Sequence, residues 1–524
     1  MIILTPEQMN RLDEYVINKL NIPGTVLMEH AALAVAEKVE KMVEGIPEPK
    51  AVLFVGTGNN GGDGFAAARI LESKGIKTVT CLFGDPEKIK GDARVNYDIH
   101  KAMGLTLLEY GKDRHEEFVR NVQEADLAVD ALMGTGFSGT PRYPIDEAIH
   151  ILNGYAKKVL SVDIPSGVNG TDGSVSTCCV QADETVTFCC LKPGLCLYPG
   201  RGMAGNVTVV PIQIPKQAVE RMNSTMHFVD ADLAREWLPL RKVDGNKGDY
   251  GRLTIITGTG GMTGASVLAA KAAYRTGSGL VYLLTDKKTL PVFETTAIEA
   301  VKIPIESDSL EEEFERLKSF LDKQDCLVIG PGMGNNERTF RIVRYFLNTD
   351  KNIVLDADGL NVLEGKTELL KTSKANIVIT PHPGEMSRLC GKSIGEIQMN
   401  RLKAAGDFAA QTGVTVVLKG AGTVISSPEG IHMINSTGSA GLSVAGSGDV
   451  LSGMIGSLMG QGLPTLKACA LGVYLHGLAG EYAADQFTEY GVTASDIIEL
   501  IPSAYKGAGK NYNRPAGVFD LTCT

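Results

Sequence analysis

Several signals that mark common classes of protein are missing from this sequence. The first residues, MIILTPEQMNRLDEY, show no basic segment followed by an apolar run, and no stretch reaches about 18 apolar residues, so we expect neither a signal peptide nor a membrane span. The net charge is −10 without a visible basic stripe, which argues against a nucleic-acid partner. The ten cysteines include no CxxC and no zinc-like spacing with histidine, so we expect reduced thiols in a cytoplasmic protein.

Local motifs of several enzyme classes are also absent. Gly391-Lys392-Ser393 has Met386 where a Walker A loop requires glycine, and Gly365-Lys366-Thr367 has Gly359 one position too far away. The sequence contains no GxSxG elbow, no HExxH helix and no EF-hand loop. Phosphoryl chemistry, if the protein performs it, must therefore use another glycine-rich design.

Glycine is the abundant residue. The chain has 60 glycines in 524 residues, or about 11%, against a usual ~7%. The 22 prolines and the lack of a G-X-Y period exclude collagen and low-complexity chains. With 44% hydrophobic and 21% charged residues the chain can build large cores, so we expect its glycines at specific ligand-binding turns.

Two series of short apolar runs alternate with helical patterns. Runs of this kind predict parallel sheets that are buried on both faces, and so an α/β fold. The segment 214–244 interrupts the rhythm, and we place the domain boundary there, with domains at 1–220 and 221–505 and a C-terminal tail at 506–524. The expected strands of the first series are 51–55, 77–83, 126–132, 158–164 and 184–188, and those of the second are 252–258, 280–285, 326–330, 352–358, 376–380 and 414–420.

Two glycine loops in the first half follow predicted strands. Residues 56–61 match GxGxxG and precede a helix, where backbone amides and the helix N-terminus favour a phosphate. Residues 134–139 give a second such pattern. The alternative for the first loop is a tight turn in which Asp63 caps the following helix.

Polar side chains gather at the ends of three strands of the first half. Ligands of open α/β sheets collect at such ends, so we expect these side chains to share one crevice. Their oxygens suit a hydrogen-bond network or a hard cation, and one carboxylate could transfer protons. The alternative is an Asx-type turn before Gly167. The side chains are Asn60, Asp130, Asp163 and Ser166.

The second half has its own candidate phosphate site. Gly446-Ser447-Gly448-Asp449 precedes a helical pattern, where amides can hold an anion and the acid can deprotonate an attacking hydroxyl. A simple helix start with a favourable acidic charge is the alternative. Residues 419–423 join two apolar strands and form either a nucleotide clamp or a hairpin. His382, held between two prolines, follows another strand.

Together, these motifs resemble a fused NAD(P)H-hydrate epimerase and NAD(P)H-hydrate dehydratase over roughly residues 1–505. The GTGNNGGDG, VDALMGTGFSG and SVDIPSGVNG segments, with the KPGL and YPG pattern at 192–200, resemble the epimerase domain. The NKGDYG, GPGMG, LDADGLN, TPHPGEM, LKGAGT and GSGDVLSG segments resemble the dehydratase. The resemblance implies a Rossmann-like three-layer α/β/α domain followed by a ribokinase-like α/β domain.

The resemblance also implies an activity. It implies that the first domain interconverts the R and S hydrates of NADH or NADPH, and that the second dehydrates the S epimer with ADP, or alternatively ATP, as the phosphoryl donor. With ADP the products are NAD(P)H, AMP and phosphate. The implied cofactors are K⁺ for the epimerase and Mg²⁺ for the dehydratase, and we expect a homo-oligomer.

Site residues follow from the same resemblance. Asp163 is our choice for the acid–base group of the epimerase, and Asp449 for the base of the dehydratase. The implied epimerase substrate contacts are Asn59, Asn60, Gly61, Gly62, Asp63, Gly134, Thr135, Gly136, Phe137, Ser138, Gly139, Thr140 and Asp163, and the K⁺ ligands are Asn60, Asp130 and Ser166. The implied hydrate contacts of the dehydratase are Ala265, Gly334, His382 and Asp449, and its nucleotide contacts are Lys419, Gly420, Ala421, Gly422, Thr423, Gly446 and Gly448.

Two features leave an alternative open. Val444 and Ala445 stand where the dehydratase usually has Thr-Gly, and Ser439-Ala440 replaces a common Asn-Pro pair, which affects the expected nucleotide geometry. A ribokinase-like kinase of a vitamin precursor, with an N-terminal ligand-binding or scaffold domain, would use nearly the same GSGD chemistry. The TPHPGEM and NKGDYG segments favour the dehydratase.

Overall fold

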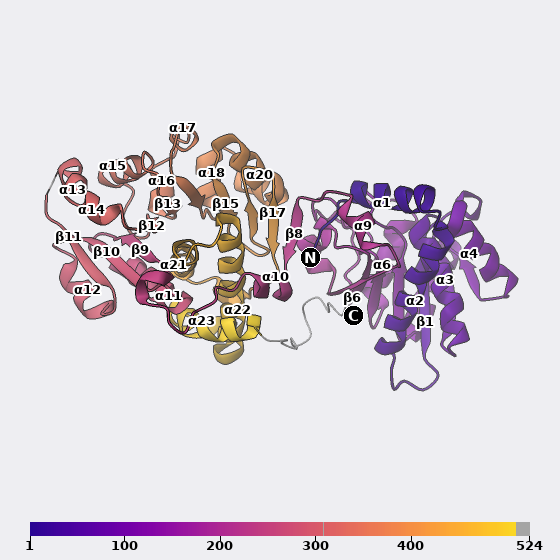
Figure 1. The fold of residues 1–524 in the computed structure, drawn as a ribbon. Coiled ribbons are helices and arrows are strands. Elements are labelled where there is room, and N and C mark those ends of the chain that lie inside the picture. The colour runs from indigo at the N-terminus through magenta and orange to yellow at the C-terminus, as the bar shows by residue number, and fades with distance from the viewer. Residues whose placement is uncertain (308, 510–524) are drawn as a thin grey trace. The chain divides into compact units, whose positions relative to one another are not determined.

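The computed structural model describes residues 1–307 and 309–509. These residues divide into two compact units, the first formed by Met1–Ser224 and the second beginning at Thr225. Strands and helices alternate along most of both units (Figure 1). The predicted α/β fold is therefore confirmed in each unit.

The first unit is built on a parallel sheet of seven strands. The strand order is β3-β2-β1-β4-β5-β6-β7, and every neighbouring pair is parallel. Five of these strands were predicted; β3 and β7 were missed because one is very short and the other alternates with polar residues. The strands are β1 (Lys50–Val55), β2 (Lys77–Leu82), β3 (Leu107–Glu109), β4 (Leu127–Ala131), β5 (Val159–Val162), β6 (Glu184–Phe188) and β7 (Asn206–Val210).

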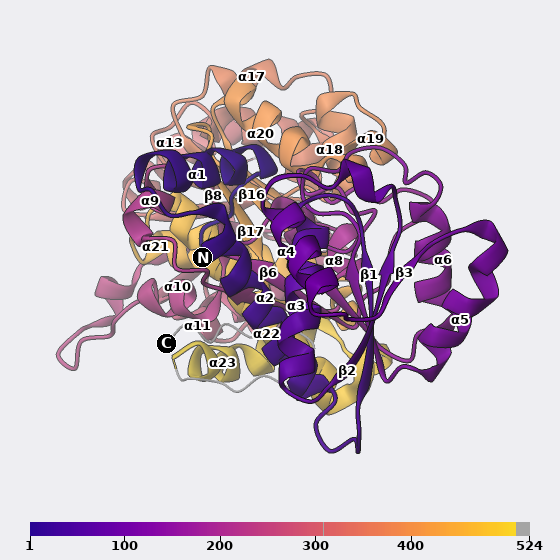
Figure 2. The ribbon, with the colours of Figure 1, turned by 90° about the vertical axis from the view of Figure 1, so that its right-hand side faces the viewer.

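Helices cover both faces of this sheet. Along β1, Leu53 and Val55 belong to one core with α2 and α3, while Val52 and Phe54 belong to another with α5 and α6. Figure 2 shows α2 and α3 on one side of the strands and α5 and α6 on the other. The three-layer prediction is thus correct. The helices of this unit are α1 (Pro6–Lys19), α2 (Gly24–Met42), α3 (Asn59–Ser73), α4 (Gly91–Ala102), α5 (His115–Glu124), α6 (Ile145–Tyr155), α7 (Pro193–Cys196), α8 (Gly200–Met203) and α9 (Lys216–Glu220).

The first helix, α1, is fixed at its start by a capping box between Thr5 and Gln8. Its apolar stripe of Met9, Leu12 and Val16 is buried in the core. Asp13 follows Leu12 directly and therefore lies at the edge of the buried stripe.

The second unit contains a mixed sheet of ten strands. The order is β11-β10-β9-β12-β13-β14-β15-β16-β17-β8, and the pairs are parallel except β15–β16 and β16–β17. The connections of these two pairs are too short for a parallel crossover, and the first of them is the hairpin that was one alternative for residues 419–423. The strands are β8 (Met226–Val229), β9 (Arg252–Ile256), β10 (Leu280–Asp286), β11 (Val301–Ile305), β12 (Cys326–Ile329), β13 (Asn352–Leu355), β14 (Asn376–Ile379), β15 (Thr415–Leu418), β16 (Val424–Ser426) and β17 (His432–Asn435).

Small residues let the helices of this unit pack closely. A Cβ on Gly453 of α21 would lie 2.2 Å from the carbonyl oxygen of Ala269 in α11, so only glycine permits this approach. The contact holds α21 close against α11. The helices are α10 (Ala231–Glu236), α11 (Thr263–Thr276), α12 (Leu290–Thr296), α13 (Leu310–Arg316), α14 (Lys318–Leu321), α15 (Glu337–Phe346), α16 (Asp358–Asn361), α17 (Glu368–Lys371), α18 (Pro383–Cys390), α19 (Ile394–Met399), α20 (Arg401–Thr412), α21 (Ser447–Gly460), α22 (Thr465–Gly491) and α23 (Ala494–Gly509).

Two sequence expectations need correction. The segment 214–244, expected only as a break between domains, contains β8, which pairs with β17 at the edge of the second sheet. The expected tail from 506 begins later, because α23 continues to Gly509; the rest of that tail lies outside the described residues. Within 1–307 and 309–509, no helix combines the length and the apolar character needed to cross a membrane.

Candidate active sites

A cavity of about 600 Å³ lies in the first unit, at the carboxyl ends of β1, β4 and β5. Its walls include many of the side chains expected from the sequence, which are Asn59, Asn60, Asp63, Gly134, Thr135, Gly136, Phe137 and Asp163. Of the residues 134–140, the last three do not reach the cavity. Ser138, Gly139 and Thr140 are exposed and do not line the cavity.

The first glycine loop leads directly into α3. The N-cap is Gly58, whose position offers no side-chain cap, so the first amides of the helix remain available to an anion. A Cβ on Gly61 would lie 2.0 Å from the carbonyl oxygen of Gly56, which explains the glycine there. Gly61 and Gly62 are buried in the helix and do not line the cavity. Asp63 lies inside the helix and lines the cavity, so it is not a cap.

Asp163 is held by a buried lysine. Its Oδ1 accepts hydrogen bonds from Lys192 Nζ at 2.5 Å and from Thr187 Oγ1 at 3.0 Å. Lys192 is 1% exposed and donates also to Thr187 Oγ1 and to the carbonyl oxygen of Phe188. These contacts, and not an Asx-type turn, fix Asp163, whose φ is +66°.

Lys192 was not predicted as a site residue. It belongs to the KPGL segment quoted above, so a signal was present, but the sequence does not show that its ammonium reaches Asp163. With all three of its donors engaged, Lys192 is a fixed positive charge at the cavity wall.

The residues expected to hold K⁺ lie together beside Met133. Asp130 is fully buried and accepts hydrogen bonds from Ser161 Oγ, Ser166 Oγ and two backbone amides. Asn60 Nδ2 donates to the carbonyl oxygen of Met133, and the Met133 amide donates to Ser166 Oγ. Burial raises the pKa of Asp130, and these hydrogen bonds oppose the rise. Within the described residues no basic side chain pairs with the buried carboxyl of Asp130. The oxygens of Asn60, Asp130 and Ser166 lie beside this carboxyl, and such a set of oxygens fits a monovalent cation.

Asp13 is a cavity residue that sequence reasoning missed. It comes from α1, about 150 positions before Asp163, and lines the same cavity. Burial raises the pKa of Asp13 to about 6; Lys192 lowers it and Asp163 raises it. Burial, with Asp163 and Asp13 nearby, also raises the pKa of Asp63 well above its usual value. The position of Asp13 at the edge of an apolar stripe was the available signal.

The second unit brings an ion pair to the start of α21. Lys419 Nζ lies 2.8 Å from Asp356 Oδ1 and 3.7 Å from Glu385 Oε2. Ser452 of α21 donates a hydrogen bond to the other oxygen of Asp356. A Cβ on Gly448 would lie 3.3 Å from Lys419 Nζ, so the ammonium stands directly beside the first turn of α21.

Asp449 lies in that first turn. Burial raises the pKa of Asp449 to about 7; Asp356 raises it further and Lys419 lowers it. The turn is entered through Gly446, whose φ of +89° requires glycine. Ala445, by contrast, does not have a left-handed backbone, so the exchange of the usual glycine there introduces no strain.

The other predicted hydrate contacts surround this cluster. His382 is the N-cap of α18: its Nδ1 accepts from the amides of Gly384 and Glu385, and Glu385 accepts from the His382 amide. The amide of Gly334 donates to Asp358 at 2.8 Å. Ala265 stands at the start of α11, and a Cβ on Gly332 would lie 3.2 Å from its Cβ.

The expected nucleotide loop, 419–423, is a hairpin turn between β15 and β16. The two alternatives for this loop are therefore compatible. Beneath it, Arg401 is 5% exposed and donates to the carbonyl oxygens of Leu418 and Lys419. Its guanidinium lies so near Gly420 that a Cβ there would come within 2.7 Å of it. Arg401 was not predicted, because nothing in its local sequence marks it.

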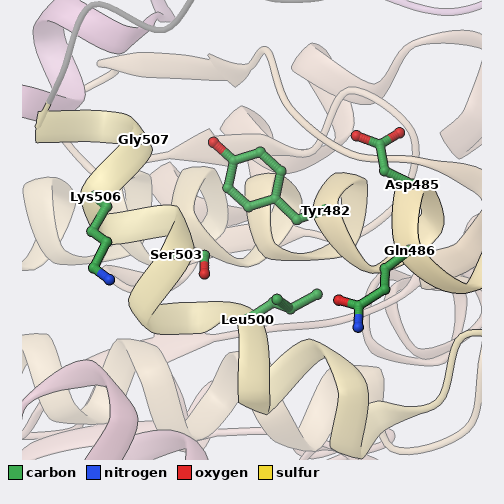
Figure 3. Close-up of a pocket in the computed structure, with 7 residues that line it drawn as sticks. All are labelled: Tyr482, Asp485, Gln486, Leu500, Ser503, Lys506 and Gly507. Atoms are coloured by element: carbon green, nitrogen blue, oxygen red, sulfur yellow. The ribbon is translucent and has the colours of Figure 1, made fainter.

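Within the described residues, no three Asp, Glu, His or Cys side chains form a metal cage. A magnesium ion at the second site would thus be held by nucleotide phosphates with few protein carboxylates, which is its usual mode of binding. A separate cavity of about 480 Å³ between α22 and α23 contains none of the predicted residues (Figure 3).

Comparisons with known proteins match both units. The family model described as YjeF-related protein N-terminus matches residues 24–194, and the model described as NAD(P)H-hydrate dehydratase matches 253–503. A bifunctional NAD(P)H-hydrate repair enzyme of Moorella thermoacetica is 38% identical over 513 residues, which are 96% of this chain and 96% of the relative. The chain belongs to the family of bifunctional NAD(P)H-hydrate repair enzymes.

Other members of this repair-enzyme family are similar. The Escherichia coli K12 enzyme is 35% identical, and the matched region covers 86% of this chain and 84% of the relative. A Bacillus subtilis ADP/ATP-dependent NAD(P)H-hydrate dehydratase, crystallised with ATP/Mg²⁺, is 28% identical and covers 54% of this chain and 98% of its own, with a TM-score of 0.47. The family resemblance seen in the motifs is confirmed, and the kinase alternative is not favoured.

Proposed function

We propose that the first unit epimerises the R and S hydrates of NADH and NADPH, and that the second dehydrates the S epimer with ADP as phosphoryl donor. The observation that carries the second half is Asp449, a carboxyl with a pKa of about 7 at the start of α21, beside Lys419. A group with such a pKa can accept a proton near neutral pH.

In the dehydratase site, Asp449 takes the proton of the hydrate hydroxyl as the oxygen attacks the terminal phosphorus of the nucleotide. The amides of Gly446 and Gly448 and the ammonium of Lys419 stabilise the charge on the transferred group. AMP leaves with the electron pair of the broken P–O bond. The electron pair of the ring nitrogen then expels phosphate from the hydrate, and the neighbouring ring carbon loses a proton, which restores the dihydronicotinamide. ATP can serve by the same chemistry, since only the terminal phosphoryl group reacts.

The dehydratase contacts have distinct roles. Glu385 fixes His382 at the N-terminus of α18, and Asp358 fixes Gly334. These two hydrogen bonds fix His382 and Gly334 in place, which supports the proposal that His382, Gly334 and Ala265 hold the hydrate. Mg²⁺, bound with the nucleotide, supplies charge neutralisation for the phosphates.

In the epimerase site, the substrate lies in the cavity of the first unit. The amides at the start of α3 hold its phosphate, and Asp163 contacts the nicotinamide ring. Asn60, Asp130 and Ser166 would hold K⁺, which would supply a positive charge beside the buried Asp130 carboxyl. We propose a cytoplasmic location for the protein, since the nine cysteines of the described residues are all free thiols. A homo-oligomeric state remains part of the proposal.

One assay tests both activities. Mixed R and S hydrates are incubated with the full chain and ADP or ATP, and the absorbance of restored NADH is followed. Conversion of the whole mixture is expected. A halt when the S form is exhausted would refute the epimerase, and no conversion with either nucleotide would refute the dehydratase.

A variant separates the two sites. Asp449→Ala is expected to abolish dehydration and to leave the interconversion of R and S unchanged. Dehydration that survives in this variant would show that Asp449 is not the base.

A further inference from the structure

The cavity of the first unit contains more acidic groups than its fixed positive charge can balance. Asp13 from α1, Asp63 from α3 and Asp163 after β5 line one cavity with Lys192, and Asp92 of α4 stands at its edge. Lys192 is committed to Asp163. Three carboxyl groups therefore share the cavity without a cation of their own.

The carboxyl groups differ in how they are held. Asp163 Oδ1 accepts hydrogen bonds from Lys192 and Thr187, so the position of this carboxyl group is fixed. Asp13 makes no hydrogen bond or ion pair with any other described residue, although its side chain is half-buried and lines the cavity. A buried carboxyl without a protein partner is costly unless it is protonated or meets a ligand.

We propose that Asp13 is the second acid–base residue of the epimerase cavity, which donates a proton to the leaving hydroxyl of the hydrate while Asp163 receives the proton of the incoming water. This inference rests on the proposed epimerase function. The two carboxyl groups come from different walls of one cavity, and each has its own role: Asp13 donates a proton and Asp163 accepts one. A pKa of about 6 for Asp13 supplies both protonation states near neutral pH.

The proposed steps conserve atoms and charge. First, the bond between the ring carbon and the hydroxyl oxygen breaks, the electron pair leaves with oxygen, and oxygen takes the proton of Asp13, so that water departs. The lone pair of the ring nitrogen forms a double bond to the same carbon. Water then adds on the opposite face, the double-bond pair returns to nitrogen, and Asp163 takes the released proton. The proton returns from Asp163 to Asp13 through solvent.

The test uses the full chain and the purified R hydrate without nucleotide, so that the dehydratase cannot act. Formation of the S hydrate is followed by chromatographic separation. Asp13→Asn is expected to lower kcat by at least about 100-fold, as for loss of a general acid. Asp13→Glu, which keeps the carboxyl, is expected to recover part of this loss. Glu14→Gln, the same change at the exposed neighbouring residue, is expected to match the wild type.

The pH profile separates catalysis from a structural role. In the wild type, kcat for epimerisation should fall as pH rises through about 6, because the acid form of Asp13 is lost. This fall should be absent from Asp13→Asn. A variant that only disturbs the cavity would raise KM and keep the wild-type profile, and this result would overturn the inference.

Two further outcomes are decisive. In heavy-oxygen water the wild type should introduce one labelled oxygen for each inversion; inversion with retained oxygen would refute the proposed steps. If the wild type interconverts R and S and Asp13→Asn does so equally well, only the role of Asp13 fails. If the wild type cannot interconvert them, the epimerase function itself fails. Dehydration of the S hydrate with ADP, measured on each variant, reports that the chain is folded.

Discussion

The most informative perturbation of the second unit is Asp449→Asn, because it should inactivate the dehydratase and stabilise the fold. Asp449 has a pKa of about 7 in the folded chain, against a usual 3.8. The folded state therefore binds more protons than the unfolded state between these values, and stability falls as pH rises through that window. Above about pH 7 the cost is complete and constant.

The size of the effect follows from the shift. About three pKa units correspond to about 4 kcal/mol at most. Because Asp449 is partly exposed and Lys419 lies nearby, we expect about half, or about 2 kcal/mol. With an unfolding entropy of about 2.1 cal/mol/K per residue, that amount raises the Tm of a unit of this size by about 3 °C. The asparagine variant keeps the shape of the side chain and removes the charge, so it should gain this stability at high pH only.

Calorimetry of the wild type and the variant from about pH 4 to about pH 8 measures the difference in Tm of the second unit. The difference should be small at the acidic end, grow through the window and level off above about pH 7. Asp350→Asn, at an exposed position of the same unit, serves as the matched control and should show no such trend. A difference in Tm that is constant across pH, or a variant that is less stable at alkaline pH, would refute the claim that the ionised carboxylate of Asp449 destabilises the folded unit.

Three other predictions follow from single contacts. Lys192→Met should destabilise the first unit by about 3–5 kcal/mol because it leaves Asp163 unpaired, and adding Asp163→Asn should recover part of the loss in a thermal melt. Gly61→Ala should cost at least about 1–3 kcal/mol through its clash with a backbone carbonyl, whereas Gly58→Ala, with no atom within 4 Å of the new Cβ, should be tolerated; equal melting temperatures would contradict this. Arg401→Lys should raise KM for the nucleotide severalfold and leave epimerisation unchanged, because lysine cannot make both hydrogen bonds to the carbonyl oxygens of Leu418 and Lys419. An unaltered KM would show that Arg401 does not support the loop.

Much of the architecture was predictable because its signals are local. Continuous apolar runs gave strands such as β1 and β12 to within a residue, and small residues before an apolar helix gave the start of α21. The missed strands are short, lie at sheet edges or alternate with polar residues. The hairpin between β15 and β16 was one of two alternatives for residues 419–423, whereas the antiparallel pairing of β16 with β17 was not predicted.

The sites were predictable only where one segment supplies the chemistry. Asp163 directly follows β5, and Asp449 lies in the first turn of α21 just after a glycine, which are local features. The pairing of Lys192 with Asp163, of Lys419 with Asp356, and the arrival of Asp13 from α1 depend on tertiary packing. No periodicity in the sequence reports such encounters, since they join residues that are 29, 63 and 150 positions apart.

The place of β8 in the second sheet has a consequence for synthesis of the chain. This strand begins the second unit, yet among the described strands its one partner is β17, about 200 residues later. At about 5–20 residues per second, the ribosome needs roughly 10–40 s to produce that partner. Throughout this interval the first unit is already complete, while Met226–Val229 has an unsatisfied backbone edge. The second unit thus closes its sheet last, at the strand that was made first, and a nascent chain stalled before His432 should be the form most prone to aggregation.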